Sequence, residues 1–194
     1  VLGAFFIWDS INGMRVVYSS NDIYNSSVAS VFAINNKARF VGFTGGQLGN
    51  GGRPFLGDSS GIHYLSGSQG SAKSINNSNQ AAGFLYLVGN GYEAPYFWDS
   101  DGSAINISPS DSLCGQQVRG VGQSYGCGQA VAISNAGQVV DYYNSRRTNG
   151  STLTPFLWDK TNGFRNINLP SNFALPFYDK IGMGINSKGE IILN

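Results

Sequence analysis

Residues 33–42 read AINNKARFVG, and this pattern of an apolar segment, an asparagine-containing corner and a second apolar segment decides the fold. The same frame returns without a gap at residues 74–83 (SINNSNQAAG), 132–141 (AISNAGQVVD) and 184–193 (GINSKGEIIL). Asparagine and glycine tolerate a positive φ, and an Asn side chain can hydrogen-bond to its own backbone two residues further on. Each copy is therefore predicted to be a tight β-hairpin, in which the asparagines are structural.

A second motif alternates with the first and supplies two further strands. Each copy is an aromatic-rich segment that ends in an aspartate and is followed by a glycine, in the pairs Asp9 and Gly13, Asp58 and Gly61, Asp99 and Gly102, and Asp159 and Gly163. The Asp side chain can accept hydrogen bonds from the N–H groups that follow it, while the glycine takes a left-handed conformation. The two motifs together predict a unit of four strands that recurs at a spacing typical of propeller blades.

The sequence thus predicts an all-β fold, a four-bladed β-propeller of four-stranded antiparallel blades. A single domain covers residues 1–194, with blades at about 29–66, 70–108 and 128–170 and a last blade at about 180–194 plus 3–18. In this last blade the C-terminal motif supplies strands one and two and the N-terminal motif supplies strands three and four. Pairing of these terminal strands would close the ring and leave no open sheet edge. The alternative is that the chain is a slice of a longer ring or array.

Side-chain size differs between the strands of each unit. The first strand carries small residues, as in residues 71–75, whereas the third strand is bulky and contains Trp8, Trp98 and Trp158. Large side chains suit a wedge between neighbouring sheets. A stripe of tryptophans can also bind sugars, but its fixed place in the repeat favours core packing.

The motifs resemble those of the HAF-type extracellular repeat family, whose units contain an Ile-Asn corner followed by glycine and a later Ala-Phe-Leu-Trp segment. The matching residues are Ile34-Asn35, Ile75-Asn76, Ile185-Asn186, Ile133 before Asn135, and three Trp-Asp pairs, whereas Gly57 departs from the motif where a fourth Trp is expected. The resemblance covers most of the chain. It implies a β-propeller fold and a secreted or cell-surface setting, and it implies neither a reaction nor catalytic residues.

The composition excludes several classes of protein. Only 12% of the residues are charged and the net charge is +1, so the chain lacks the clustered basic residues that nucleic acids and anionic membranes attract. Its apolar runs are shorter than the roughly 20 residues of a membrane helix, and no basic-then-apolar signal segment opens the sequence. We expect no membrane insertion. The 27 glycines include glycine-rich stretches without the Lys-Ser/Thr ending of a phosphate loop, and no cofactor is predicted.

Cys114 and Cys127 are close enough in sequence for a disulfide that would close a short loop. Two free thiols are the alternative. A metal site is not predicted, because His63 is the only histidine. Residues 99–102 (DSDG) share part of a calcium-loop pattern, but no glutamate follows at the twelfth position.

The connections that differ between units are expected to emerge together on the face opposite the repeated turns, at residues 19–28, 44–53, 66–70, 89–94, 108–128, 144–154 and 170–179. Loops that vary on a common scaffold are where binding usually resides. Their polar and aromatic residues suit a neutral hydroxylated ligand or a protein partner. The candidate ligand-binding residues are Tyr24, Arg53, Tyr92, Glu93, Arg119, Tyr125, Asp141, Arg146, Arg147 and Tyr178. Asp141 is included because it stands where other units have Gly42 and Gly83.

These residues favour a non-catalytic extracellular or surface binding module that recognises a glycan or another surface ligand. A protein-docking scaffold or a fragment of a larger propeller is the second interpretation. A small glycan-acting hydrolase is the third, because Glu93, Asp141 and Asp179 can all approach the variable face and paired carboxylates cleave glycosidic bonds. A catalytic triad would have to use His63, which is expected to be an ordinary strand residue. The sequence leaves the oligomeric state open.

Overall fold

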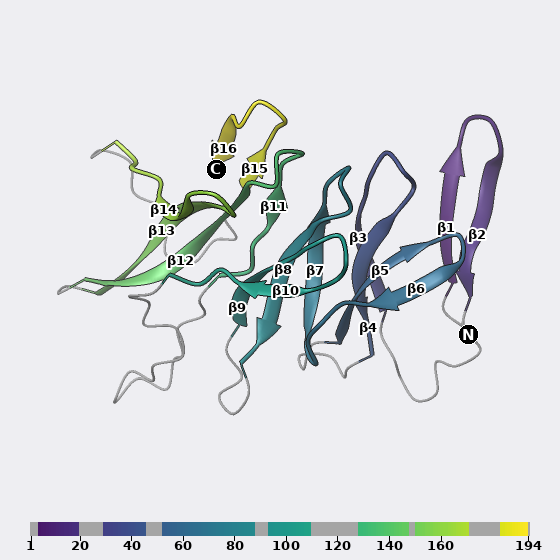
Figure 1. Cartoon of the computed structure of the whole chain (residues 1–194), viewed down its shortest axis with the longest axis horizontal. Helices are drawn as coiled ribbons and strands as arrows, with labels where there is room; N and C mark the ends of the chain where they lie inside the picture. Colours follow the sequence, from purple (N-terminus) through teal and green to yellow (C-terminus); the bar gives the residue numbers. More distant parts are fainter. Residues whose placement is uncertain are drawn as a thin grey trace.

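The computed structural model of the chain describes residues 4–19, 29–45, 52–87, 93–109, 128–147, 150–170 and 183–193. Every regular element in these ranges is a β-strand, and all strand pairs are antiparallel. Three four-stranded sheets, flanked by two hairpins, follow one another in chain order (Figure 1). The all-β prediction and the prediction of repeated four-stranded sheets are therefore confirmed.

The elements have the following bounds. The N-terminal hairpin is β1 (Ala4–Asp9) and β2 (Gly13–Ser19), and the C-terminal hairpin is β15 (Met183–Ile185) and β16 (Ile191–Leu193). The first sheet is β3 (Ala29–Ile34), β4 (Phe40–Thr44), β5 (Arg53–Asp58) and β6 (Gly61–Tyr64). The second sheet is β7 (Gly70–Ile75), β8 (Ala81–Tyr86), β9 (Glu93–Trp98) and β10 (Ala104–Asn106). The third sheet is β11 (Ala132–Ile133), β12 (Val139–Arg147), β13 (Gly150–Asp159) and β14 (Gly163–Asn166).

The two hairpins do not pair with each other in the part of the chain that the structure describes. There, β1 pairs only with β2, and β16 pairs only with β15. The N-terminal hairpin packs beside the first sheet, whereas β15 contacts β11 and β12 of the third sheet (Figure 1). The stack is therefore open, and the expected pairing of the terminal strands is not present in it. None of the described segments forms a helix with the length and hydropathy needed to cross a bilayer.

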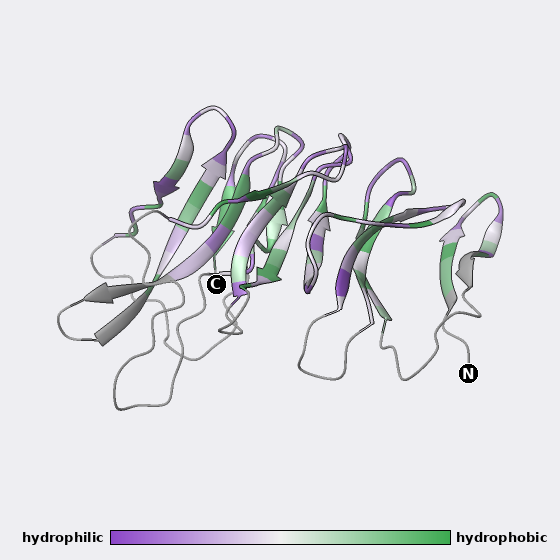
Figure 2. Cartoon of the chain, turned by 60° about the horizontal axis from the view of Figure 1, so that its bottom comes forward, coloured by the Kyte–Doolittle hydropathy of each residue, from purple (hydrophilic) through white to green (hydrophobic). Residues whose placement is uncertain are grey.

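The asparagine corners close as the sequence predicts. In the first sheet, Asn35 Oδ1 accepts hydrogen bonds from the backbone N–H groups of Lys37 (2.9 Å) and Arg39 (3.0 Å). In every copy the residue three positions after Asn35 or its equivalent takes a positive φ. These residues are Ala38, Asn79, Gly137 and Gly189. Hydrophilic residues gather at these turns and hydrophobic residues on the strands (Figure 2).

The same corners also bond from sheet to sheet, which the sequence did not predict. Asn35 Nδ2 donates to the Asn76 carbonyl oxygen (2.9 Å), and Asn76 Nδ2 donates to that of Ser134 (3.1 Å). The Asn77 N–H donates to Asn135 Oδ1 (3.0 Å). The Asn side chain thus accepts hydrogen bonds within its own turn through its oxygen and donates one to the next sheet through its nitrogen. The repeated corners therefore connect successive sheets by hydrogen bonds.

Buried apolar clusters fill the spaces between consecutive units. One lies between the first and second sheets, one between the second and third sheets, and one between the N-terminal hairpin and the first sheet. They contain Leu56 and Trp98, Phe97 and Trp158, and Phe5 and Phe55, respectively. Each sheet therefore buries its faces against its sequence neighbours, as stacked sheets must.

Trp98 and Trp158 are buried, as predicted, but Trp8 is exposed and the prediction is wrong for this residue. Trp98 and Trp158 each pack against the preceding sheet, whereas in the described part of the chain no unit packs on the face of β1 that carries Trp8. At Gly57, where the motif lacks its tryptophan, a Cβ atom would lie 2.4 Å from the ring of Phe40. Phe40 on the adjacent strand therefore occupies the space that a tryptophan side chain fills in the other sheets.

Candidate functional site

Three of the predicted ligand-binding residues have described side chains, namely Arg53, Glu93 and Asp141. Only the backbone is described for Arg146 and Arg147, which pair with Ser151 and Gly150 in a continuous β12–β13 ladder. The prediction of a loop at 144–154 is therefore wrong, because the two strands continue to pair as far as Arg147 and Gly150. The other predicted positions lie outside the described residues: Tyr24, Tyr92, Arg119, Tyr125, Tyr178, Asp179, and both cysteines of the expected disulfide, Cys114 and Cys127.

Glu93 lies at the start of β9, at the end of the second sheet opposite the asparagine corners. Its cross-strand partner Tyr86, at the end of β8, donates its hydroxyl to Glu93 Oε1 (3.2 Å). Gln129 Nε2, from the segment that leads into the third sheet, donates to Glu93 Oε2 (2.7 Å). Both carboxylate oxygens are therefore oriented by side chains from two sheets, while Glu93 itself remains half-buried.

Asp141, the second acidic residue of this group, is fully buried. Its Oδ2 accepts hydrogen bonds from the backbone N–H groups of Gln129 and Ala130, the latter at 2.6 Å, and its Oδ1 is buried without a partner among the described residues. Gly128 allows this close approach, because a Cβ atom there would lie 2.5 Å from Asp141 Oδ2 and the backbone has a φ of +107°. Gln129 thus joins the two acidic residues, through its side chain to Glu93 and through its backbone to Asp141.

Burial raises the pKa of Asp141 to about 7, against the lowering effect of its hydrogen bonds from the backbone. The negative charge of Glu93 adds a smaller upward contribution. Burial also raises the pKa of Tyr86 and of Tyr142, and the Glu93 charge acts on both in the same direction. The cluster therefore combines the half-buried side chain of Glu93 with a buried carboxyl group, Asp141, that is about half protonated at neutral pH.

The repeat explains why Asp141 is placed here. In the first two sheets the equivalent residues are Gly42 and Gly83, where a Cβ atom would lie 1.8 Å from the Ser30 oxygen and 2.0 Å from the Ser71 oxygen. A side chain at this position therefore keeps the first strand away. In the third sheet β11 is accordingly reduced to two residues, and the Asp141 carboxyl group binds the backbone that would otherwise have paired with β12. The third blade, which was predicted to begin at about residue 128, therefore has a first strand of only two residues.

Arg53 forms a second group at the same end of the first sheet. Its guanidinium carbon lies 4.1 Å from the centre of the Tyr64 ring, and the Tyr64 hydroxyl is 3.0 Å from Thr44 Oγ1, within hydrogen-bond distance. All three residues stand at strand ends opposite the corners, and Arg53 and Tyr64 are exposed. In the first sheet, the strand ends opposite the asparagine corners thus present an aromatic ring, a guanidinium group and a hydroxyl group.

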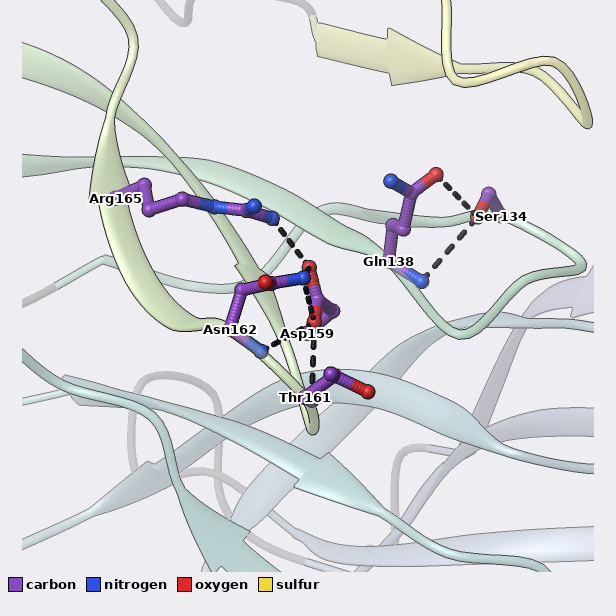
Figure 3. A network of polar contacts seen from close by, with 6 residues as sticks. All are labelled: Ser134, Gln138, Asp159, Thr161, Asn162 and Arg165. Carbon is purple, nitrogen blue, oxygen red and sulfur yellow. Dashed lines mark hydrogen bonds and ion pairs between the residues drawn. The ribbon is translucent and has the colours of Figure 1, made fainter.

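On the side of the stack that carries the asparagine corners, the polar residues around Asp159 form hydrogen bonds and an ion pair with one another. Asp159 accepts hydrogen bonds from the N–H groups of Thr161 (3.0 Å) and Asn162 (2.7 Å) and pairs with Arg165 (Figure 3). Burial alone would raise the pKa of Asp159, but these hydrogen bonds and the Arg165 charge hold it below its usual value. The network borders a cleft of about 240 Å³ between the second and third sheets, beside Lys160.

The partial calcium-loop pattern at residues 99–102 has protein partners in place of a metal. The hydrogen bond from Lys160, followed by that from Gln80, lowers the pKa of Asp99 to about 2. Asp101 caps its own turn by accepting from the Ser103 N–H (2.9 Å). Among the described residues, no three His, Cys, Asp or Glu side chains gather as a metal site would require.

The geometry does not favour the hydrolase interpretation for Glu93 and Asp141. A glycosidase places two carboxyl groups on either side of a substrate, with room for the sugar or a water between them. Asp141 is fully buried and its Oδ2 is bound to the backbone, so its carboxyl group has no access to a substrate. His63 is an exposed residue of β6, as expected of an ordinary strand residue.

Sequence reasoning missed Tyr64, Tyr86 and Gln129. The strand register would have revealed Tyr86, because extending the β8–β9 pairing from Ala81 and Trp98 brings it opposite Glu93. No sequence signal points to Gln129, since it precedes the shortened β11. Neither a protein-family model nor a curated protein sequence matches this chain. The assignment of function therefore depends on the geometry of the described residues and on the sequence motifs.

Proposed function

We propose that this chain is a non-catalytic binding module that recognises a glycan through the strand ends opposite the asparagine corners. The observation that carries this proposal is the arrangement of Glu93, whose two carboxylate oxygens are held in place by Tyr86 and Gln129 while the residue stays half-exposed. An oriented carboxylate accepts hydrogen bonds from sugar hydroxyl groups, and an exposed aromatic ring such as that of Tyr64 packs against a sugar face.

The setting proposed for this module is extracellular or at a cell surface, as the resemblance to HAF-type repeats implies. The sheets are proposed to act as propeller blades, which agrees with their four-stranded form, their order and their shared corners. A closed ring of four blades would need β16 to lie beside β1 of the same chain. Disulfide trapping between the two terminal hairpins distinguishes this closure from pairing between two copies.

Glycan-array binding by the whole chain tests the function. We expect wild-type protein to bind at least one glycan class. Glu93→Ala should weaken binding about tenfold or more, because a hydrogen bond to a charged group contributes roughly 1.5–3 kcal/mol. Tyr64→Ala should also weaken binding, because it removes the aromatic ring that packs against the sugar. Asp101→Asn is the matched control. It changes an exposed carboxylate on the corner side and keeps an oxygen for the Ser103 N–H, so its binding should equal that of wild type.

Absence of binding to any glycan by the folded wild-type chain would overturn the proposal and favour a protein-docking scaffold. Equal losses in all three variants would also overturn it, because binding would then not depend on the end of the stack that carries Glu93.

A further inference from the structure

One edge of the N-terminal hairpin is apolar and unpaired in the described part of the chain. On β1, Phe6 is 58% exposed and Trp8 is 68% exposed, whereas the equivalent residues of complete sheets, Phe55 and Trp98, are each 0% exposed. Phe55 and Trp98 pack against the unit that precedes their sheet, and β5 and β9 each also have a second strand at the edge that is open on β1 in the described residues.

A cavity of about 350 Å³ lies beside this edge. It is lined mainly by Phe5, Phe6 and Ile7 of β1 and by Val31, Phe32 and Ile34 of β3. The three β3 residues are exposed, although the positions equivalent to Val31 in the other sheets, Ala72 and Ala130, are fully buried. The cavity is therefore the space that the first and second strands of a blade occupy elsewhere in the stack.

The register of the complete sheets identifies the strand that fits this edge. Their second and third strands pair as Phe40 with Gly57, Ala81 with Trp98 and Val139 with Trp158. The fourth copy of the first motif continues this alignment on β16, where Ile191 takes the place of Val139. The same register would set Ile191 opposite Trp8, Ile192 opposite Ile7 and Leu193 opposite Phe6.

β16 also has an exposed apolar side chain that a neighbouring strand would cover. Ile192 is 71% exposed, whereas its counterpart Val140 is 0% exposed. The two hairpins are thus complementary halves of one sheet, and each exposes the residues that the complete sheets bury.

We propose that β15–β16 of a second copy of this chain docks against β1, so that two copies together form a four-stranded sheet in the order β15, β16, β1, β2. The occupant is a second copy because the hairpins of one chain lie on different sheets. β15 packs on the third sheet and the N-terminal hairpin on the first, with the second sheet stacked between them (Figure 1). Such a contact is head to tail. In a pair of copies, one copy therefore keeps a free N-terminal hairpin and the other keeps a free C-terminal hairpin.

Disulfide trapping tests the partner and the register together. In a background with Cys114 and Cys127 changed to serine, Ile7→Cys is made in a chain with a short tag and Ile192→Cys in a chain with a long tag. Directly opposite residues of antiparallel strands have the spacing that a disulfide needs. Mild oxidation of the mixture should yield a mixed-length dimer as the main product on non-reducing gels. The control replaces Ile7→Cys with Ile11→Cys, an exposed residue of the β1–β2 turn outside the expected ladder.

A mixed dimer that forms with Ile7→Cys at least tenfold faster than with Ile11→Cys supports the proposal. Equal rates, or no mixed dimer, overturn it. A chain that carries both Ile7→Cys and Ile192→Cys provides the second arm. If this chain forms only an internal disulfide at low protein concentration, the ring closes within one copy and the proposal is overturned.

Discussion

The carboxyl group of Asp141 shows how one side chain alters a repeated sheet. Where the other sheets have glycine, their first strand passes within contact distance of the backbone. Asp141 replaces two of the lost contacts by binding the N–H groups of Gln129 and Ala130. Because Gln129 also binds Glu93, this substitution links a structural feature of the third sheet to the carboxylate that we propose binds ligand.

The raised pKa of Asp141 predicts an unusual dependence of stability on pH. The folded chain keeps the Asp141 proton up to about pH 7, whereas the unfolded chain loses it near pH 4. Between these values the folded state binds more protons, so the free energy of unfolding should fall as the pH rises, by about 2–4 kcal/mol from this residue. Asp141→Asn keeps an oxygen for both backbone N–H groups and does not titrate, so it should abolish this part of the decrease.

Urea denaturation at pH 4.5 and pH 8 measures the effect as the difference between wild type and Asp141→Asn. Asp101→Asn is the control, since the pKa of Asp101 is lowered and this residue does not titrate in the window. Parallel changes of stability in wild type and Asp141→Asn would show that the carboxyl group is already ionised in the folded chain at pH 4.5, and that its pKa is not raised.

Each of these strand pairs contains one large aromatic side chain, although the residues of the pairs differ. Where the third strand has tryptophan, the second strand has Ala81 or Val139, and where the third strand has Gly57, the second strand has Phe40. The large side chain therefore changes strand but fills the same place between the sheets. The sequence shows Gly57 only as a missing tryptophan, because its replacement comes from a residue of the other motif.

This exchange predicts that a double variant recovers stability that the single variants lose. Phe40→Ala should destabilise the chain by about 3–5 kcal/mol, since it removes a buried aromatic ring. Gly57→Trp should also destabilise it, because its Cβ atom meets the Phe40 ring. The double variant recreates the pair Ala81 and Trp98, so we expect a favourable coupling of about 1–3 kcal/mol in a double-mutant cycle by chemical denaturation. Additive losses would mean that the two side chains do not share one space.

Much of the stack was predictable from the sequence, because the repeated turns are stabilised by residues that are close together in the chain. The corners at Asn35 and Asn76 and the turns after each aspartate depend on residues close in the chain, and they form as expected. The bonds from Asn35 to the second sheet depend on how sheets are placed in space, so the motif alone does not show them. The same limit applies to the site, where Glu93 and Asp141 were identified but Gln129, which joins them, was not.

The sequence left two arrangements open, a closed ring and a slice of a longer array, because the motifs indicate which strands belong to one sheet but not which chain supplies them. Trp8 and Ile192 are exposed, and in the described part of the chain β1 and β16 each pair only within their own hairpin. We therefore propose that the strand ends opposite the asparagine corners bind ligand and that the two terminal hairpins join copies of the chain.

Molar mass in solution tests whether β16 of one copy completes the sheet of another. Light scattering is measured on the wild-type chain and on Ile192→Asp over a hundredfold range of concentration. We expect the wild-type mass to rise above that of the monomer as concentration increases, while the charged variant stays monomeric because an unpaired carboxylate would be buried at the contact. A wild-type chain that remains a monomer at every concentration would contradict the docking of β16 against β1 of a second copy.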